Sequence, residues 1–80
     1  MSEFQIFVRT LEDKTQNVTV FESDKVIDLK NRISAIIGLP VKQMMLIFNS
    51  KQLNDNDLVK DYSIQKNCQV MVIRQLKGGL

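Results

Sequence analysis

The sequence predicts an α+β fold in which a sheet of about five strands packs on one long helix. Two early segments, residues 4–10 and 15–21, alternate apolar and polar side chains, which is the period of a half-buried strand. Residues 26–37 change to the three- and four-residue spacing of a helix. Two later apolar segments, residues 44–48 and 69–75, have the composition of strands. A chain of 80 residues suffices for one small domain.

The first two strands are expected to form a hairpin. In the segment FQIFVRT, Phe4, Ile6 and Val8 point to one face of the strand, and the intervening residues point to the other. The polar residues LEDK supply a turn, and TQNVTVF then resumes the alternation. Gln16 interrupts the apolar face of this second strand, which suggests that the strand lies near an edge of the sheet.

The long helix presents one apolar stripe to the sheet. The members of the stripe recur at helical spacing and are Val26, Leu29, Ile33 and either Ile36 or Ile37. Leu29 and Ile33 are expected to anchor the core. The polar residues between them are expected to face solvent and are Asp28, Lys30, Asn31 and Arg32. Ser23 or Asp24 is expected to cap the amino end, and Gly38 followed by Leu39-Pro40 predicts the end of the helix.

The second half of the chain supplies the remaining strands. MMLIF predicts a third strand, NS a tight turn and KQL a short fourth strand. A helical turn is expected around LVKDY, before the last strand QVMVIRQ. The segment between them, LNDNDL, contains Asp55 and Asp57, a carboxylate pair that could serve acid-base chemistry. Its density of Asn and Asp is more typical of turns.

Two strands are expected to carry apolar side chains on both faces. If Leu46 faces the helix, Met45 and Ile47 face outward, and the same alternation in the last strand turns Met71 and Ile73 outward. A solvated face does not need four apolar side chains, so a contiguous patch indicates a binding surface for a partner. The patch exists only if the two strands are neighbours in the sheet.

The composition excludes several classes of function. Eleven basic and nine acidic residues are spread along the chain for a net charge of +2, so no strong footprint for nucleic acid is present and no nucleic acid partner is expected. The sequence has no histidine, which excludes histidine-based catalytic triads and Cys/His zinc sites. Cys68 has no neighbouring base and is interpreted as a bystander thiol. We therefore expect neither enzymatic activity nor a metal or other cofactor.

The sequence also bounds the setting in which the chain works. Its apolar runs are far shorter than a membrane span, and MSEFQIFVRT lacks the features of an export signal, so no membrane association is expected. A single cysteine cannot form an internal disulfide, which agrees with a reducing compartment. The cytoplasm and the nucleus are therefore the expected locations, and the chain is expected to be a monomer.

Several short motifs together resemble the ubiquitin family. They occur in the family's order and without gaps, and are QIFVRTL, KT, SD, LIF, KQL, DY, IQK and LKGG. The resemblance covers residues 4–79 and implies the β-grasp fold, with its mixed sheet on one helix. It divides the chain into a short amino-terminal extension at 1–3, a ubiquitin-like domain at 4–75 and a flexible tail with two glycines at 76–80.

The resemblance also implies a function. Ubiquitin-like modifiers are adenylated at a terminal glycine, passed to enzyme cysteines as a thioester and joined to a lysine amine of a target. Gly79 is similar to the reactive glycine, and Gly78 to the glycine before it. The family's hydrophobic recognition patch corresponds here to Leu11, Ile47, Met71 and Ile73, where Met71 replaces a histidine. The lysines that match sites of chain building are Lys51, Lys66, Lys14 and Lys30.

The sequence departs from ubiquitin at three places. Gln75 replaces an arginine that the activating enzyme contacts, and glutamine cannot reproduce the charge or the bidentate hydrogen bonds of arginine. Residues 1–3 precede the family's usual start, so that Phe4 takes the place of its first methionine. Leu80 follows the reactive glycine, which implies a precursor that a processing protease cuts after Gly79.

Two functions therefore remain open from the sequence. In the first, the chain is a conjugated modifier, and its partners are activating, conjugating and ligase enzymes, a processing protease, receptor domains and target lysines. In the second, the domain is a binding module that presents the same patch and is never attached to another protein. The two glycines favour the first, while Gln75 and Leu80 leave room for the second. A more distant third is a scaffold or nucleic-acid role for the same fold.

Overall fold

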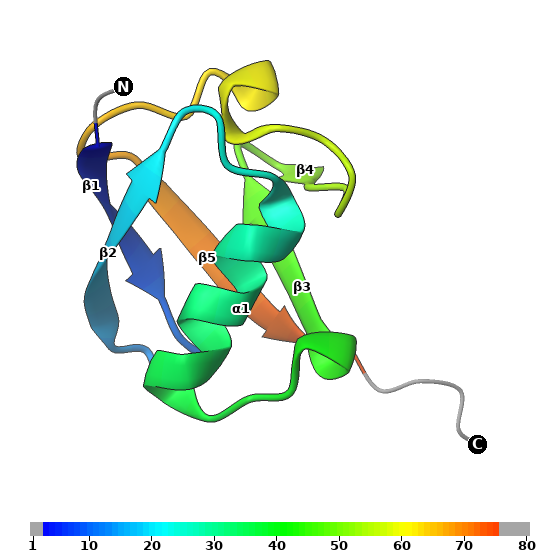
Figure 1. Cartoon of the computed structure of the whole chain (residues 1–80). Helices are drawn as coiled ribbons and strands as arrows, with labels where there is room; N and C mark the ends of the chain where they lie inside the picture. Colours follow the sequence, from blue (N-terminus) through cyan, green and yellow to red (C-terminus); the bar gives the residue numbers. More distant parts are fainter. Residues whose placement is uncertain (1–2, 76–80) are drawn as a thin grey trace.

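The strands of the sheet curve around one side of a long helix (Figure 1). The structure is a computed structural model, and it describes residues 3–75 of the chain. Its strands are β1 (Glu3–Arg9), β2 (Thr15–Phe21), β3 (Met44–Phe48), β4 (Lys51–Gln52) and β5 (Gln69–Arg74). Its helices are α1 (Val26–Ile37) and two short 3-10 turns, η1 (Val41–Gln43) and η2 (Val59–Tyr62). The expected strands and long helix are confirmed to within one or two residues, whereas η1 was not predicted.

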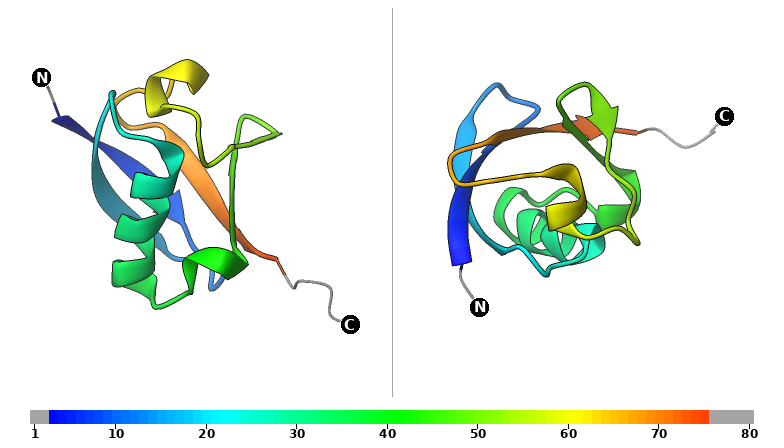
Figure 2. Two further views of the ribbon diagram at one scale, coloured as in Figure 1. Left: turned by 45° about the vertical axis from the view of Figure 1, so that its right-hand side comes forward. Right: turned by 90° about the horizontal axis from the view of Figure 1, so that it is seen from above.

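The sheet is mixed, and the two strands of its parallel pair come from opposite ends of the described chain. The strand order is β2-β1-β5-β3-β4. β1 runs parallel to β5, with Val8 opposite Val70, and the other neighbouring pairs are antiparallel. The views in Figure 2 show α1 held inside the curve of this sheet. The prediction of a mixed sheet on one helix is therefore confirmed, and β2, which contains Gln16, is an edge strand as expected.

The core fills the space between α1 and the concave face of the sheet. Its side chains come from the inward faces of the strands and of the helix. The fully buried ones include Ile6, Val8, Val20, Val26, Leu29, Ile33, Leu46 and Val70. Each such side chain contributes about 1.5–3 kcal/mol by leaving water. Of the two isoleucines that could end the apolar stripe of the helix, Ile37 packs against the core and Ile36 is 46% exposed.

The amino end of α1 differs from the expectation. The residue at the N-cap is Lys25 and not Ser23 or Asp24, so the predicted cap is wrong. The Lys25 side chain makes no capping hydrogen bond, and its backbone N–H donates to Asp28 Oδ2 at 3.0 Å. The Asp24 carboxylate is used elsewhere: it accepts hydrogen bonds from the Phe21 backbone N–H and from Arg32, both at 2.9 Å.

Backbone carbonyls of a distant loop take the place of a side-chain cap. The N–H groups of Val26 and Ile27 donate to the carbonyl oxygens of Asp57 and Asp55, at 2.8 and 3.1 Å. These two amides belong to the first turn, where a helix has no partners of its own. The loop that contains Asp55 and Asp57 therefore completes the start of α1, which sequence-local capping rules could not predict.

The carboxyl end of α1 follows the prediction. Gly38 adopts a left-handed backbone conformation with φ of 78°, and its N–H donates to the carbonyl of Ser34 at 2.9 Å. Glycine adopts this conformation without the steric cost of a Cβ atom. The tight turn between β3 and β4 uses the same region of backbone space at Asn49 and Ser50, with φ of 56° and 68°.

Tyr62 holds the loop between β4 and η2 in place. Its hydroxyl donates to Asp57 Oδ2 at 2.6 Å and accepts a hydrogen bond from the Asn54 backbone N–H at 3.0 Å. The hydrogen bond to Asp57 raises the pKa of the Tyr62 phenol above its usual 10.0. The carboxylate of Asp57 thus serves the loop geometry that the Asn/Asp-rich sequence predicted, and the same loop completes the start of α1.

We expect Tyr62→Phe to lower the free energy of unfolding by about 1–3 kcal/mol, because it removes both hydrogen bonds of the phenol. The higher pKa of the folded phenol also predicts how the stability of the protein changes with pH. The stability that it contributes is complete below pH 10, and is lost as pH rises through the folded pKa. Urea unfolding at neutral and alkaline pH measures both effects. Equal loss of stability with rising pH in the wild type and in Tyr62→Phe would contradict this assignment.

Candidate binding surface and attachment site

β3 and β5 are neighbours, so their outward side chains form one continuous surface. In the antiparallel register Met45 lies opposite Ile73, and Ile47 lies opposite Met71. Directly opposite side chains on one face of a sheet lie about 4.5–5.5 Å apart at Cβ. We call this set of four side chains the β3–β5 face. The sequence analysis could predict its members from alternation, but only the strand pairing makes them contiguous.

The side chains of the β3–β5 face are available to a partner. Met71 and Ile73 are 42% and 38% exposed, while Met45 and Ile47 are half-buried beside them. β5 lies between β1 and β3, and β3 lies between β5 and β4, so the face that a partner meets is made by the outward side chains of strands inside the sheet. This arrangement suits association through buried apolar area.

Leu11 lies beyond the end of this face, in the turn between β1 and β2. Its side chain is 48% exposed and lines a hollow of about 330 Å³ together with Arg74, the residue that follows Ile73. Ile36, from the last turn of α1, lines the same hollow and is the one large exposed apolar residue of the described range that the predicted patch did not include. The signal was present in the sequence, because Ile36 and Ile37 cannot both face the core.

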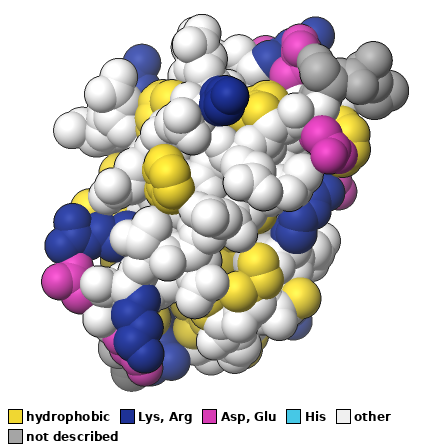
Figure 3. All heavy atoms as spheres, turned by 90° about the vertical axis from the view of Figure 1, so that its left-hand side faces the viewer, with side chains coloured by type: hydrophobic (Ala, Val, Ile, Leu, Met, Phe, Trp, Pro, Cys, Tyr) yellow, Lys and Arg dark blue, Asp and Glu magenta, His cyan; other side chains and the backbone are white. Residues whose placement is uncertain are grey.

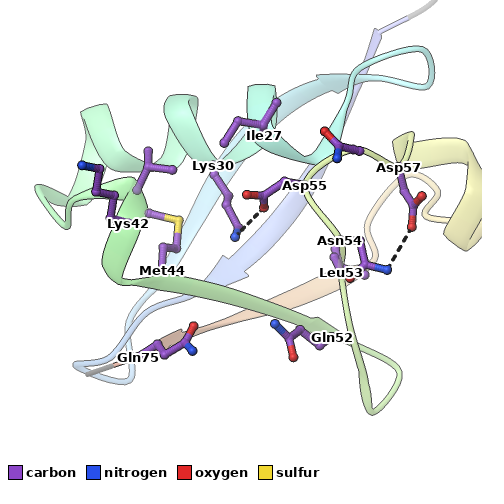
Figure 4. Close-up of a pocket in the computed structure, with 12 residues that line it drawn as sticks. Ile27, Lys30, Lys42, Met44, Gln52, Leu53, Asn54, Asp55, Asp57 and Gln75 are labelled. Atoms are coloured by element: carbon purple, nitrogen blue, oxygen red, sulfur yellow. Dashed lines mark hydrogen bonds and ion pairs between the residues drawn. The ribbon is translucent and has the colours of Figure 1, made fainter. Parts of the chain in front are cut away.

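Lys30 is buried, which corrects the expectation that it faces solvent. The residue is 7% exposed, and its Nζ lies 2.7 Å from Asp55 Oδ1 (Figure 4). The pair lies at an open hollow of about 810 Å³ bordered by α1, η1 and the loop after β4. A helical wheel places Lys30 on the polar side of α1, but the loop carrying Asp55 covers that side. Its amine is therefore the least suitable of the four candidate lysines for attachment of another chain.

The other three candidate lysines are exposed. Lys51 lies on β4, opposite Phe48 of β3. Lys66 lies in the loop before β5. Lys14 lies in the turn between β1 and β2, where its Nζ is 3.8 Å from Glu12 Oε1, a solvent-exposed ion pair of little energetic weight.

The attachment site itself lies beyond the described residues. Gln75 is the last described residue; its side chain is exposed, and its backbone N–H donates to the carbonyl of Gln43 at 2.7 Å. This hydrogen bond fixes the point beside η1 from which the chain continues. Gly78, Gly79 and Leu80, to which conjugation and processing were assigned, lie outside the described range.

The remaining chemistry-bearing groups form no second site in the described range. Cys68 is half-buried, and its Sγ accepts a hydrogen bond from the Gln65 N–H at 3.3 Å. Within residues 3–75 no group of three or more Cys, Asp or Glu residues is placed to hold a metal ion. The same range contains no helix with the length and hydropathy that a bilayer span requires.

Charges are mixed over the surface on the side of β1 and β2. Figure 3 shows basic and acidic side chains interspersed there, with exposed hydrophobic side chains in small separate groups. Arg9 and Asp13 form an ion pair in this region, with Arg9 Nε 2.7 Å from Asp13 Oδ1. The mixed charges agree with the small net charge of +2, and this side of the surface has no continuous basic stripe.

The sheet order, the single long helix and the apolar outer face define a protein of the ubiquitin-like β-grasp class. Comparison with known proteins agrees, because residues 6–77 match the ubiquitin family. The chain belongs to the ubiquitin family.

Three relatives differ in how much of their own length the chain covers. Ubiquitin-like protein NEDD8 of Dictyostelium discoideum is 33% identical over 75 residues, which are 94% of this chain and 97% of that protein. NEDD8-like protein RUB1 of Saccharomyces cerevisiae is 35% identical over 72 residues, 90% of this chain and 94% of that protein. AN1-type zinc finger protein 4 of Mus musculus is 29% identical over 75 residues, 94% of this chain. The chain spans only 10% of the mouse protein.

The burial of Lys30 makes a prediction about its reactivity. With a limiting amount of an amine-acylating reagent, Lys51, Lys66 and Lys14 should be modified first, because acylation needs an exposed, uncharged amine. Lys30 should react at least roughly tenfold more slowly, since its amine is both covered and held by Asp55. Peptide mass spectrometry of the native protein measures the order, and acylation of the unfolded protein in denaturant serves as the control. Labelling of Lys30 at the rate of Lys51 would show that the ion pair does not persist in solution.

Proposed function

We propose that this protein is a ubiquitin-like modifier that is made as a precursor and attached through the Gly79 carboxylate to lysine amines of target proteins. The observation that carries the proposal is the position of Gly78-Gly79, directly after the family match, in a chain that aligns with nearly the whole of two ubiquitin-like proteins. The role is non-enzymatic: the protein supplies the acyl group and the recognition surface, and other proteins supply the catalysis.

The proposed chemistry needs one free carboxylate. The Gly79 carboxylate attacks the α-phosphorus of ATP and releases pyrophosphate, which leaves an acyl adenylate. An enzyme thiolate then displaces AMP to form a thioester, and a lysine amine displaces the thiolate to form the isopeptide bond. Two successive residues without Cβ atoms fit a narrow catalytic cleft in each of these enzymes.

Residues on either side of the glycines set the requirements of the pathway. A residue following Gly79 carries the carboxylate away from the position that reacts, so a protease has to remove the chain from Leu80 onward. Gln75 presents an uncharged amide where ubiquitin has an arginine, so the matching activating enzyme is one that does not require a cation there. The hydrogen bond from the Gln75 N–H to Gln43 holds this side chain at the surface of the domain.

The recognition surface of the proposed modifier is the patch of Leu11, Ile47, Met71 and Ile73, read by helical or zinc-based receptor domains. The geometry supports this assignment, because Ile47 lies opposite Met71, and Leu11, Met71 and Ile73 are exposed. The surface is small, so each domain should bind weakly and several linked copies should bind more tightly. A monomer in the cytoplasm and the nucleus is the form that we propose for this role.

A second function is favoured by a different observation. The similarity to AN1-type zinc finger protein 4 is confined to 10% of that protein, so this domain type also occurs as part of a longer chain. In such a setting the domain is a binding module that presents the same patch without being conjugated. Gln75 and the residue after Gly79 are compatible with this alternative.

Thioester formation separates the two functions. The full chain, a version ending at Gly79 and that version with Gly79→Ala are incubated with ATP and activating enzymes for ubiquitin and ubiquitin-like proteins. We expect a reducible thioester only from the version that ends in Gly79, because a further residue or an added methyl group obstructs the narrow site. Thioester from both the full and shortened chains would overturn the precursor assignment, and thioester from neither would favour the binding module.

Receptor binding tests the patch independently of conjugation. Ile47→Ala should weaken binding of a helical ubiquitin-receptor domain by about 2 kcal/mol, the loss that is typical of a central interface residue. Ile27→Ala is the matched control, since it makes the same substitution at a half-buried isoleucine of α1 that belongs neither to the β3–β5 face nor to the hollow beside Leu11. Calorimetric titration measures binding, and thermal unfolding verifies that both variants fold. Equal affinity of the Ile47→Ala variant and the wild type would remove the patch from the proposal.

A further inference from the structure

The methionines of the described range differ sharply in their surroundings. Met71 is 42% exposed on the β3–β5 face, opposite Ile47. Met45 is half-buried on the same face, opposite Ile73. Met44, its neighbour in sequence, is 2% exposed and faces the core. The chain therefore carries an exposed, a partly covered and a buried thioether on two paired strands.

We propose that Met71 is a site of reversible oxidation, and that its sulfoxide releases receptor domains from the β3–β5 face. This inference rests on the proposed use of that face as the recognition surface. Methionine contributes a flexible apolar side chain to a binding surface, whereas its sulfoxide is polar and accepts strong hydrogen bonds. A polar sulfoxide oxygen beside Ile47 has to be desolvated before a receptor binds, which costs affinity.

The oxidation step is a two-electron oxygen transfer from a hydroperoxide. A lone pair of the Met71 sulfur attacks the nearer peroxide oxygen and forms the S–O bond while the O–O bond breaks. The departing hydroxide takes the proton from the new S–OH group, which leaves the sulfoxide and one water when hydrogen peroxide is the oxidant. The sulfur is oxidised and the peroxide reduced. Thiol-dependent sulfoxide reductases reverse the reaction.

The position of Met71 allows the surface to change without loss of the fold. Its side chain lies on the solvent side of β5, so the core under α1 contains neither the thioether nor its sulfoxide. Arg9 on β1 is the strand partner of Met71 on the other side from Ile47. The Arg9 guanidinium uses Nε and Nη2 for its ion pair with Asp13, and its remaining N–H groups are suitable donors for a sulfoxide oxygen.

The exposures predict an order of reaction. Met71 reacts first because peroxide reaches its sulfur directly, Met45 reacts more slowly, and Met44 is protected until the protein unfolds. Met44 is therefore an internal control for global unfolding during oxidation. Oxidation of Met44 at the same rate as Met71 would overturn the inference, because selectivity by exposure is its premise.

The experiment titrates the full chain with a helical ubiquitin-receptor domain before and after limited treatment with hydrogen peroxide. Peptide mass spectrometry locates the added oxygen, and a methionine sulfoxide reductase with a thiol reductant is then used to reverse it. We expect oxidation at Met71 to weaken binding on the order of tenfold, as for loss of a central interface residue, with recovery after reduction. Thermal unfolding and the state of Met44 report whether the fold is intact.

Met71→Leu is compared with itself before and after peroxide. Leucine has no sulfur, so this variant should lose most of the response to peroxide and keep only the part that Met45 contributes. Met45→Leu measures how much of the loss of receptor affinity comes from the second thioether. This variant should keep most of the response to peroxide. Met71→Gln places a permanent amide at the same point and should bind as weakly as the oxidised protein.

The outcomes distinguish this inference from the proposed function. Selective oxidation of Met71 with unchanged binding, in a protein whose binding Ile47→Ala weakens, would overturn only the role of Met71. An equal response to peroxide in the wild type and Met71→Leu would also overturn it. Absence of receptor binding by the reduced wild-type protein would overturn the recognition patch and the oxidation switch together.

Discussion

The parallel pairing of β1 with β5 is the contact on which the rest of this structure depends. It joins a strand near the start of the chain to a strand near its end, with Val8 beside Val70 under the helix. Because β5 also pairs with β3, this contact places β5 at the centre of the sheet. The concave face then closes over Leu29 and Ile33 of α1, and the convex face receives the apolar side chains that alternate with the core residues.

Polar groups far apart in sequence complete what the apolar core begins. The first amides of α1 bond to carbonyls of the loop after β4, and Lys30 of the helix is paired with Asp55 of that same loop. At the other side of the domain, Arg32 donates to both Asp24 and the carbonyl of Thr19 on edge strand β2, at 2.9 and 2.8 Å. In a chain of 80 residues the core alone leaves little stability in reserve, so these contacts matter for holding one conformation.

In the proposed function, the end that is attached continues from the strand that carries part of the surface that is read, because Gln75 follows Ile73 by two residues. The β3–β5 face occupies the outside of the central strands, while the chain leaves the domain at Gln75 beside η1. The chain has no histidine, and the methionines give the face an apolar surface without a titratable group.

The sequence by itself determined the periodic elements. Alternation fixed the first two strands and their turn, and the helical spacing together with Gly38 fixed α1, because these signals depend only on residues close together in the chain. The members of the outward apolar set followed from the same alternation. The motifs also sufficed to indicate the ubiquitin family, to which the chain belongs.

Only the tertiary structure decided which of these features meet. The sequence could not pair β3 with β5, choose Ile37 over Ile36 as the core residue, or move the helix cap from Asp24 to distant carbonyls. The sequence also wrongly predicted that Lys30 faces solvent, for the same reason. Local periodicity reports the side of a helix on which a residue lies, whereas burial depends on what covers that side, and here a loop 25 residues further along the chain brings Asp55 to the lysine amine.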